Sequence, residues 1–280
     1  MCLRPFSLKR AYSDVGMCPP QLRFLWKDDI ELPCGKCVEC VQQYSREWAF
    51  RCALEASCWP ENCFVTLTYA VDPVSLVPEH LQRFLKRLRD KEKPRMIRFF
   101  ACGEYGSKGM RPHYHLILFN YKPKDLIFFK RTKKGEKIYT SASLSKLWGN
   151  GFVSVGDVSL QSAKYCAKYM QKLNPLPPPS MTDGVVLHPA FTRMSNRPGI
   201  GFFAINPESV LTDKIYVNGQ HMHIPRYFLK VLEREKNGYD MDLTWLKERR
   251  VERARHFAPT PEELQKKRDA AESTFGPLAY

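Results

Sequence analysis

Two histidines and a glutamate near the middle of the sequence have the types and spacing of a metal site. His113 and His115 are separated by one residue in Arg111-Pro-His-Tyr-His-Leu-Ile-Leu-Phe119. In a β-strand, side chains two apart face the same way, so the imidazoles would project together. An H-x-H pair alone is more often two unrelated histidines. Glu104 favours the metal, because it ends the preceding expected strand and a hairpin would return it beside them; otherwise it would cap loop amides. Two imidazoles and a carboxylate with open positions suit Mg²⁺ or Mn²⁺ acting on a phosphate.

Two tyrosines four residues apart form a second group that could do chemistry. Tyr165 and Tyr169 would stack on one face of a helix, with Lys172 close to the same line. The face that would pack on a sheet is small and apolar: Ala163, Ala167 and Met170. A tyrosine hydroxyl can attack a phosphodiester and keep its 5′ side as a phosphotyrosine, while a lysine adds positive charge. Taken alone, tyrosines at this spacing are more often core aromatics.

Three cysteines precede an expected helix with the spacing Cys34-x2-Cys37-x2-Cys40. They could bind structural zinc, which usually takes four ligands. The fourth ligand could be one of four other cysteines: Cys2, Cys18, Cys58 or Cys63. Free thiols beside a helix start are the alternative interpretation.

Apolar periodicity predicts the elements that must position these residues. Strands are expected over residues 64–69, 96–104, 113–119 and 152–158, and helices over 41–57, 79–91, 143–148 and 160–173. The residues after His115 are apolar on both faces, so their strand belongs in the middle of a sheet. A proline run after residue 174 is the clearest boundary. We expect an N-terminal helical, cysteine-containing segment over 1–60, a catalytic core over 61–175 and a mixed, then helical, region over 176–280.

The composition indicates a polyanionic partner. The 280 residues include 44 Lys and Arg against 29 Asp and Glu, a formal charge of +15. Nucleic acid is the usual partner of so basic a protein, although a merely basic surface is the alternative. Interleaved aromatics favour single strands, whose bases stack on rings. We expect no membrane span, no signal peptide and no structural disulfides, and therefore a cytoplasmic protein.

In combination and order, these residues resemble the HUH endonuclease superfamily, and more closely the replication initiators of gokushovirus-type microviruses. Phe64-Val-Thr-Leu-Thr-Tyr69 is similar to the family's first core strand. His113-Tyr-His115 resembles its metal motif, with Tyr114 in the hydrophobic slot, and Glu104 matches the additional carboxylate ligand. Tyr165 and Tyr169 resemble its two-tyrosine motif. Two further segments are also similar: Pro33-Cys-Gly-Lys-Cys37 with Cys40, and Met194-Ser-Asn-Arg-Pro-Gly-Ile-Gly201.

The resemblance covers roughly residues 30–230 and implies an α+β fold. This fold has a central antiparallel sheet of about five strands flanked by helices, with the histidines on a middle strand and the tyrosine helix beside it. Here it would carry an N-terminal cysteine-rich and a C-terminal helical extension. The resemblance also implies rolling-circle replication in the cytoplasm of a bacterial host. One tyrosine nicks the origin strand, the freed 3′-OH primes a host DNA polymerase, and the second tyrosine allows the displaced strand to be rejoined.

Other functions remain open at this point. Another HUH activity is one alternative, as in a plasmid initiator, a relaxase or a transposase; a non-catalytic single-stranded DNA-binding protein is another. No G-x4-G-K-[ST] motif occurs, so unwinding would need a host helicase. A second H-x-H pair, His221 and His223, has no tyrosine pair after it, and we interpret it as surface histidines.

Overall fold

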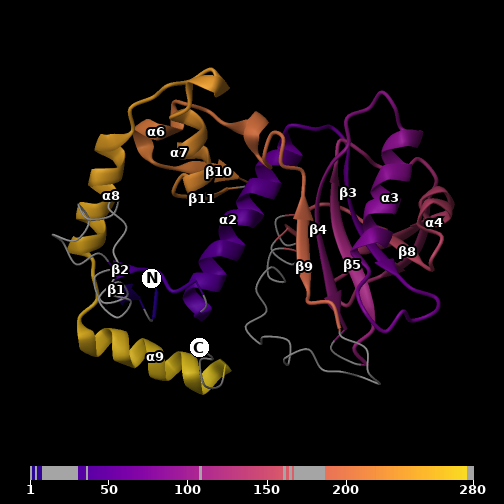
Figure 1. Ribbon diagram of the computed structural model, residues 1–280, viewed down its shortest axis with the longest axis horizontal. Helices are drawn as coiled ribbons and strands as arrows, with labels where there is room; N and C mark the ends of the chain where they lie inside the picture. The colour runs from indigo at the N-terminus through magenta and orange to yellow at the C-terminus, as the bar shows by residue number, and fades with distance from the viewer. Residues whose placement is uncertain are drawn as a thin grey trace, which may run out of the picture. The chain divides into compact units, whose positions relative to one another are not determined.

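The computed structural model contains a seven-stranded sheet that is antiparallel throughout. Its order is β6-β7-β8-β3-β5-β4-β9. The strands are β3 (Asn62–Thr68), β4 (Arg98–Tyr105), β5 (Pro112–Phe119), β6 (Leu126–Arg131), β7 (Lys137–Ser141), β8 (Val153–Gly156) and β9 (Phe191–Met194). Helices flank this sheet (Figure 1), so the predicted α+β class is confirmed.

The structure describes residues 2–3, 5–7, 31–35, 37–106, 109–159, 162–163, 166, 187–217 and 219–275. The chain divides into two units, Met1–Tyr44 with Val251–Tyr280, and Ser45–Arg250. The large sheet lies in the second unit. The boundaries near residues 60 and 175 expected from the sequence stay a prediction.

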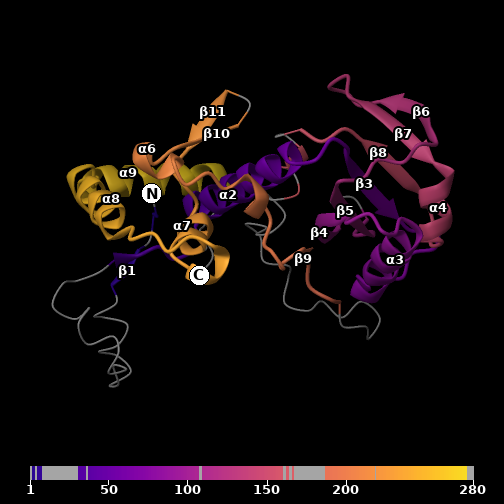
Figure 2. The same cartoon turned by 90° about the horizontal axis from the view of Figure 1, so that it is seen from above.

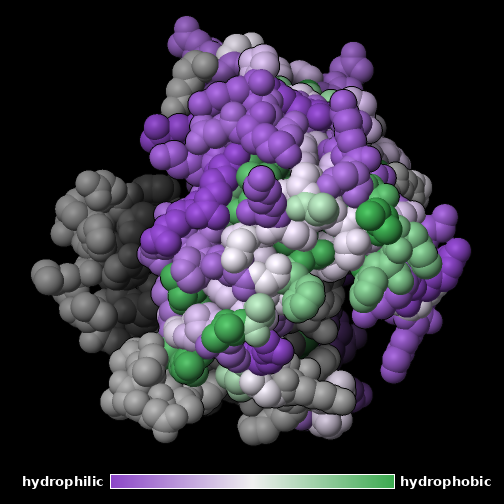
Figure 3. Space-filling view, turned by 90° about the vertical axis from the view of Figure 1, so that its right-hand side faces the viewer, coloured by the Kyte–Doolittle hydropathy of each residue, from purple (hydrophilic) through white to green (hydrophobic). Residues whose placement is uncertain are grey.

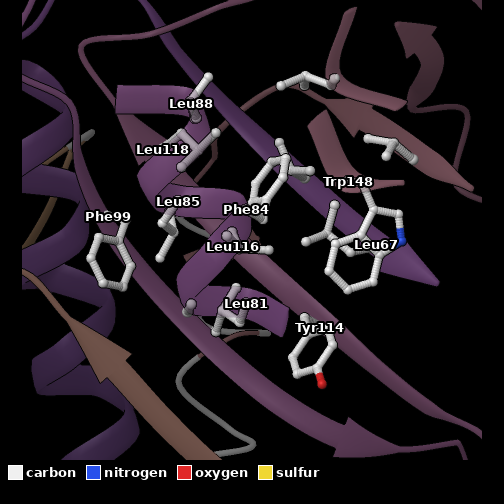
Figure 4. Close-up of a cluster of buried hydrophobic side chains, with 14 of the residues drawn as sticks. Leu67, Leu81, Phe84, Leu85, Leu88, Phe99, Tyr114, Leu116, Leu118 and Trp148 are labelled. Carbon is white, nitrogen blue, oxygen red and sulfur yellow. The ribbon is translucent and has the colours of Figure 1, made fainter. Parts of the chain in front are cut away.

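One face of the sheet is covered by α3 (Pro78–Lys91) and α4 (Ala142–Trp148). Proline in the first turn and basic residues in the last turn suit the two ends of α3. Its buried stripe meets the sheet (Figure 4), through Leu81, Phe84, Leu85 and Leu88. Trp148 closes this core, and its indole Nε1 donates to the carbonyl of Thr68 at 2.9 Å.

The opposite face packs against α2 (Val38–Ser57) through Trp48, Ala49 and Cys52. These side chains meet alternate residues of β4 and β5, because the two strands present every second side chain to this face. Ala163 and Cys166 belong to the same buried cluster. The sheet therefore has a hydrophobic core on each face.

A buried ion pair joins α2 to β4. Arg98 Nε donates to Glu55 Oε1 at 2.6 Å, and both side chains are at most 4% exposed. Glu55 Oε2 accepts the backbone N–H of Gly201 at 2.6 Å, and Arg98 also donates to the carbonyl of Gly199 at 3.0 Å. Gly201 has φ +85°, which favours glycine, and a Cβ there would lie 2.8 Å from the Phe228 ring. These contacts explain the glycines of the 194–201 segment as structural.

The rest of the Ser45–Arg250 unit packs beside the second half of α2. Its elements are η3 (Phe202–Ala204), α6 (Ser209–Thr212), the hairpin β10 (Ile215–Val217) and β11 (Gln220–Met222), α7 (Arg226–Leu232), η4 (Glu235–Asn237) and the start of α8 (Thr244–His256). Figure 2 shows the β10–β11 hairpin close to α6. Asp213 binds Arg250 through two hydrogen bonds and so ties this region to α8.

The unit formed by both ends of the chain contains the short pair β1 (Phe6–Ser7) and β2 (Glu31–Leu32), the start of α2, and α9 (Pro261–Phe275). Arg268 Nε of α9 donates to the carbonyl of Leu3 at 2.6 Å. This bond fixes the N-terminal residues against the last helix.

Four predicted strands are present, as β3, β4, β5 and β8, and β5 lies between two neighbours as expected. The expectation of about five strands was low, because β6, β7 and β9 also join the sheet. The helices predicted over 41–57, 79–91 and 143–148 are α2, α3 and α4. Most of the helix predicted over 160–173 lies outside the described residues. Among the residues searched, no helix combines the length and apolar character needed to cross a membrane.

Candidate metal centre

Strands β4 and β5 bring a carboxylate and two imidazoles together on the face of the sheet that α2 covers. Glu104 pairs directly with His113 across the strands, and Cys102 pairs with His115. Glu104 Oε1 lies 2.9 Å from His113 Nε2 and 3.1 Å from His115 Nε2. The hairpin anticipated from the sequence therefore gathers these residues, referred to below as the His–Glu site (Glu104, His113 and His115).

Hydrogen bonds on the far side of each ring orient the imidazoles. His113 Nδ1 lies 3.0 Å from the carbonyl oxygen of Arg111, which can only accept, so Nδ1 carries the proton. His115 Nδ1 lies 2.9 Å from the hydroxyl of Thr66 on β3. A neutral His113 ring then turns an Nε2 lone pair toward Glu104, an arrangement that a cation between them would stabilise.

The charge state of the His–Glu site suits a cation. Burial raises the pKa of Glu104, but hydrogen bonds from both histidines outweigh it and hold this pKa below its ordinary value. Burial lowers the pKa of His115. An ionised carboxylate and neutral imidazole are the forms that coordinate metals. Glu104 Oε2 is also buried with no hydrogen-bond partner in the described part of the chain, a cost that a bound cation would remove.

The donor atoms fit a divalent ion. One ligand atom from each of the three residues lies within 4.8 Å of the others. The donor set of two nitrogens and one carboxylate leaves positions open for substrate or water. Phe64 stacks on His115 with ring centroids 5.6 Å apart, which gives this side of the site an apolar wall.

A second group of ligand atoms is formed by the cysteine cluster (Cys2, Cys34, Cys37 and Cys40), whose sulfurs all lie within 4.8 Å of one another. The structure therefore brings the three cysteines singled out by spacing together with Cys2. Cys58 and Cys63 are not part of this group, and Cys18 lies outside the described residues. Burial raises the pKa of Cys37, but hydrogen bonds from the backbone of Cys40 and Leu3 lower it to about 7.

Tyr165, Tyr169 and Lys172 lie outside the described residues, as do Ala167 and Met170. Ala163, expected on the packing face of their helix, is fully buried. Burial, followed by a side-chain hydrogen bond to Cys102, raises the pKa of Cys166. Cys166 therefore lies next to the residue that pairs with His115 across β4 and β5.

The other histidine pair does not form a comparable group. His223 Nδ1 lies 3.0 Å from Asp213 Oδ2, whereas the His221 ring lies near Tyr216 with centroids 5.6 Å apart. Both histidines are exposed. Within the described residues they belong to neither of the two candidate metal groups.

Sequence reasoning missed two contributors, Thr66 and Cys2 as the member that completes the cysteine cluster. Thr66 pairs with His115 across β3 and β5. Alternation along the first predicted strand places Thr66 on one face, but only the register between strands shows that this face carries the histidines.

The comparisons with known proteins match this arrangement. A family model described as replication-associated protein ORF2 matches residues 62–174, the segment that contains the His–Glu site. Replication-associated protein ORF2 of Spiroplasma virus 4 is 33% identical over 278 residues, covering 89% of this chain and 85% of that protein. The chain belongs to this replication-associated protein family.

Two further relatives from small phages support the assignment. Replication-associated protein VP4 of Bdellovibrio phage phiMH2K is 35% identical over 185 residues, or 61% of the chain and 58% of that protein. Replication-associated protein ORF4 of Chlamydia phage 1 is 32% identical over 214 residues, or 72% of the chain and 54% of that protein. No solved structure matches the chain. This replication-associated protein is therefore of the microvirus type, as its motifs suggested.

Proposed function

We propose that this replication-associated protein is a metal-dependent DNA nickase and strand transferase that initiates rolling-circle replication of a circular phage genome. The observation that carries the proposal is the His–Glu site, which orients two imidazole nitrogens toward one buried carboxylate. Its place within the residues matched by the family model supports a role in the shared activity.

The His–Glu site would hold Mg²⁺ or Mn²⁺. An ion bound there would polarise a non-bridging phosphate oxygen and stabilise transition-state charge. Glu104 would supply the negative charge, and His113 and His115 the neutral nitrogen ligands. Thr66 would act as a positioning residue, because its hydroxyl fixes the His115 ring.

Tyr165 and Tyr169 are the proposed nucleophiles, with Lys172 adding positive charge. Support comes from the described neighbours Ala163 and Cys166, which pack on the sheet face that carries the His–Glu site. On a helix, Tyr165 and Tyr169 would share a side distinct from that of Ala163. Their inclusion in the matched residues 62–174 is consistent with this role.

In the proposed reaction, the phenolic oxygen of one tyrosine loses its proton and attacks phosphorus. The bond from phosphorus to O3′ breaks, O3′ takes a proton, and the 5′ side stays on the enzyme as a phosphotyrosine. The freed 3′-OH primes a host DNA polymerase. After one round, the second tyrosine cuts the regenerated origin, and the new 3′-OH attacks the first phosphotyrosine to close the displaced strand.

The proposed partners follow from this reaction. Origin DNA would be bound as a single strand or a melted duplex, in the cytoplasm of the bacterial host. A host helicase would unwind the duplex, since no P-loop motif occurs in the sequence. Zinc at the cysteine cluster would be a separate structural ion that takes no part in strand transfer.

Covalent capture tests the proposal. Protein incubated with Mn²⁺ and single-stranded DNA carrying the phage origin should form a species of higher mass on a denaturing gel. Chelation should prevent this species, and added Mn²⁺ should restore it. The double variant Tyr165→Phe, Tyr169→Phe should form none, whereas the control Tyr216→Phe, at an exposed tyrosine, should behave as wild type.

Two outcomes would overturn the nickase proposal. One is DNA binding by the wild type without any covalent species, which would identify a non-catalytic single-stranded DNA-binding protein. The other is an adduct that persists undiminished in the double phenylalanine variant.

A further inference from the structure

The cysteine cluster has the geometry of a tetrahedral metal site. Zinc–thiolate bonds of about 2.3 Å in a tetrahedron place the sulfurs about 3.8 Å apart. The sulfurs of Cys2 and Cys37 are 3.9 Å apart, and all four lie within 4.8 Å of one another. Four thiols at this separation leave room at their centre for one ion of zinc size.

Backbone amides around the cysteine cluster point at its sulfurs. The N–H of Cys34 lies 3.2 Å from Cys2 Sγ, that of Leu3 lies 3.3 Å from Cys37 Sγ, and that of Cys37 lies 3.3 Å from Cys34 Sγ. Such donors stabilise thiolates, the form that binds metal. Gly35 makes the turn between the two cysteines possible, because its φ of +73° is unfavourable for other residues.

The helix dipole adds to this stabilisation. Helix α2 begins at Val38, so Cys37 immediately precedes it and Cys40 lies in its first turn. Negative charge is favoured at a helix N-terminus. The cluster therefore combines ligand type, spacing and electrostatics.

We propose that this cluster binds one structural zinc ion, with Cys2 as the fourth ligand. The ion would attach the first residues of the chain to the start of α2. Leu3 is buried beside the site, and its carbonyl accepts from Arg268 of α9. Zinc would thus join the three parts of this unit: the N-terminus, the start of α2 and α9. The inference is independent of the proposed nickase activity.

Cobalt substitution tests this site and separates it from the His–Glu site, because thiolate–cobalt charge-transfer absorption requires sulfur ligands. The purified full chain should retain about one zinc per molecule, and Co²⁺ exchanged into it should show the charge-transfer band of a tetrahedral thiolate site. Cys2→Ser should lose the ion at chelator concentrations that leave the wild type loaded. Cys58→Ser, which removes a cysteine outside the cluster, should keep it.

A second variant guards against simple misfolding of Cys2→Ser. Cys2→His restores a zinc ligand and should recover binding with a weaker charge-transfer band. Absence of zinc and of the cobalt band in the wild type would overturn the proposal, as would oxidised cysteine pairs in a thiol titration. Equal zinc retention by Cys2→Ser and Cys58→Ser would remove Cys2 from the ligand set.

A different observation supports a second inference, about the hairpin of β6 and β7. Strand β6 is an edge strand of the large sheet, and three consecutive apolar residues on it are exposed: Ile127 (66%), Phe128 (55%) and Phe129 (59%). The pairing with β7 shifts register between Phe128 and Lys130, a bulge at Phe129. Hydrophobic side chains beside projecting hydrophilic ones are visible at the right of Figure 3, the side on which this hairpin lies.

Positive charge surrounds these rings. Between residues 126 and 141 the basic residues are Lys130, Arg131, Lys133, Lys134 and Lys137, against the single acid Glu136. Lys130 Nζ lies 5.3 Å from the centroid of the Phe129 ring. The nearby Asp125 accepts hydrogen bonds from Ser141 and Ser143, which occupy its carboxylate.

We infer that this hairpin is a binding surface for single-stranded DNA, on which bases stack on Phe128 and Phe129 while the lysines contact phosphates. Aromatic rings interleaved with cations are the general means of binding single strands. An exposed apolar edge could instead pair with a second copy, but the positive charges of two such hairpins would repel. This inference rests on the proposed function for the source of the DNA.

Equilibrium binding tests the surface apart from catalysis. In a Tyr165→Phe, Tyr169→Phe background, anisotropy of a labelled single strand of mixed sequence measures affinity without cleavage. Phe128→Ala with Phe129→Ala should weaken binding about tenfold or more. Lys133→Gln with Lys134→Gln should reduce the slope of log affinity against log salt by about 1.4. The matched control, Lys86→Gln with Lys91→Gln on the solvent side of α3, should change neither value to this extent.

Unchanged affinity in the phenylalanine-to-alanine variant would overturn the hairpin surface. A change in oligomeric state on this substitution, with DNA binding intact, would identify a second copy as the occupant and also overturn it. The nickase proposal is judged separately, by the covalent species that the native tyrosines form at saturating DNA.

Discussion

At the scale of single residues, the activity depends on how the two imidazoles are held. Each ring has a hydrogen-bond partner behind it, the Arg111 carbonyl for His113 and the Thr66 hydroxyl for His115. These partners fix which nitrogen faces the carboxylate, and such outer contacts tune metal affinity as well as the ligands themselves.

Thr66→Val should therefore weaken metal binding although Thr66 is not a ligand. The hydroxyl is lost while the shape of the side chain is kept, and we expect about 10- to 100-fold lower affinity for Mn²⁺. Titration calorimetry in the Cys2→Ser background would report on the His–Glu site alone. Thr68→Val is the control, because its hydroxyl lies near the Phe152 carbonyl and not near a histidine. Equal affinities for the two variants would contradict the positioning role.

A second prediction at this scale concerns acid stability. Burial raises the pKa of Asp213, but hydrogen bonding to Arg250 outweighs it and leaves the pKa lowered. A carboxyl with a lower pKa in the folded state stabilises the fold above its unfolded pKa of about 3.9. This stability is lost as pH falls through the folded-state pKa.

The free energy of unfolding of wild type should thus decline more steeply below about pH 5 than that of Asp213→Asn. Denaturant titrations at several pH values would measure both curves. Parallel curves for the two proteins would show that Asp213 contributes no pH-dependent stability.

At the scale of elements, a buried ion pair connects α2, β4 and the segment ending at Gly201. Loss of one partner from a buried pair costs about 3–5 kcal/mol, because the remaining charge stays buried. Glu55→Gln should lower the free energy of unfolding by about this amount. Glu61→Gln, which removes an exposed pair with Arg95, should cost at most about 1 kcal/mol. Similar costs for the two variants would contradict the importance assigned to the buried pair.

The elements that the sequence predicted are those with strong local signals. The apolar run after His115 predicted β5, and the stripe from Leu81 to Leu88 predicted α3. Strand β9 gave no such signal, because it has four residues, none fully buried, and exists through pairing with β4. Strand β6 was missed because its exposed apolar run lacks the alternation that marks a half-buried strand.

The candidate site shows the same limit. Its ligands could be named from residue types and from the return of one hairpin, which is a local feature. Thr66 and Cys2 could not, because each depends on a contact across the chain: Thr66 on the register of β3 with β5, and Cys2 on the packing of the N-terminus against Cys37.

At the scale of the whole molecule, the two candidate metal groups lie in different units. The His–Glu site belongs to the Ser45–Arg250 unit and the cysteine cluster to the unit formed by both chain ends. The family model covers only the former, whereas the Spiroplasma relative aligns with most of the chain. The account therefore assigns strand transfer to the sheet and a structural role to the cysteines.

The most direct test of the central claim is identification of the atom that DNA becomes attached to. Protein trapped on origin DNA with Mn²⁺ would be digested with protease and nuclease, and the modified peptide sequenced by mass spectrometry. The account predicts a 5′-phosphonucleotide on Tyr165 or Tyr169. Attachment to any other residue, or through a 3′-phosphate, would contradict it.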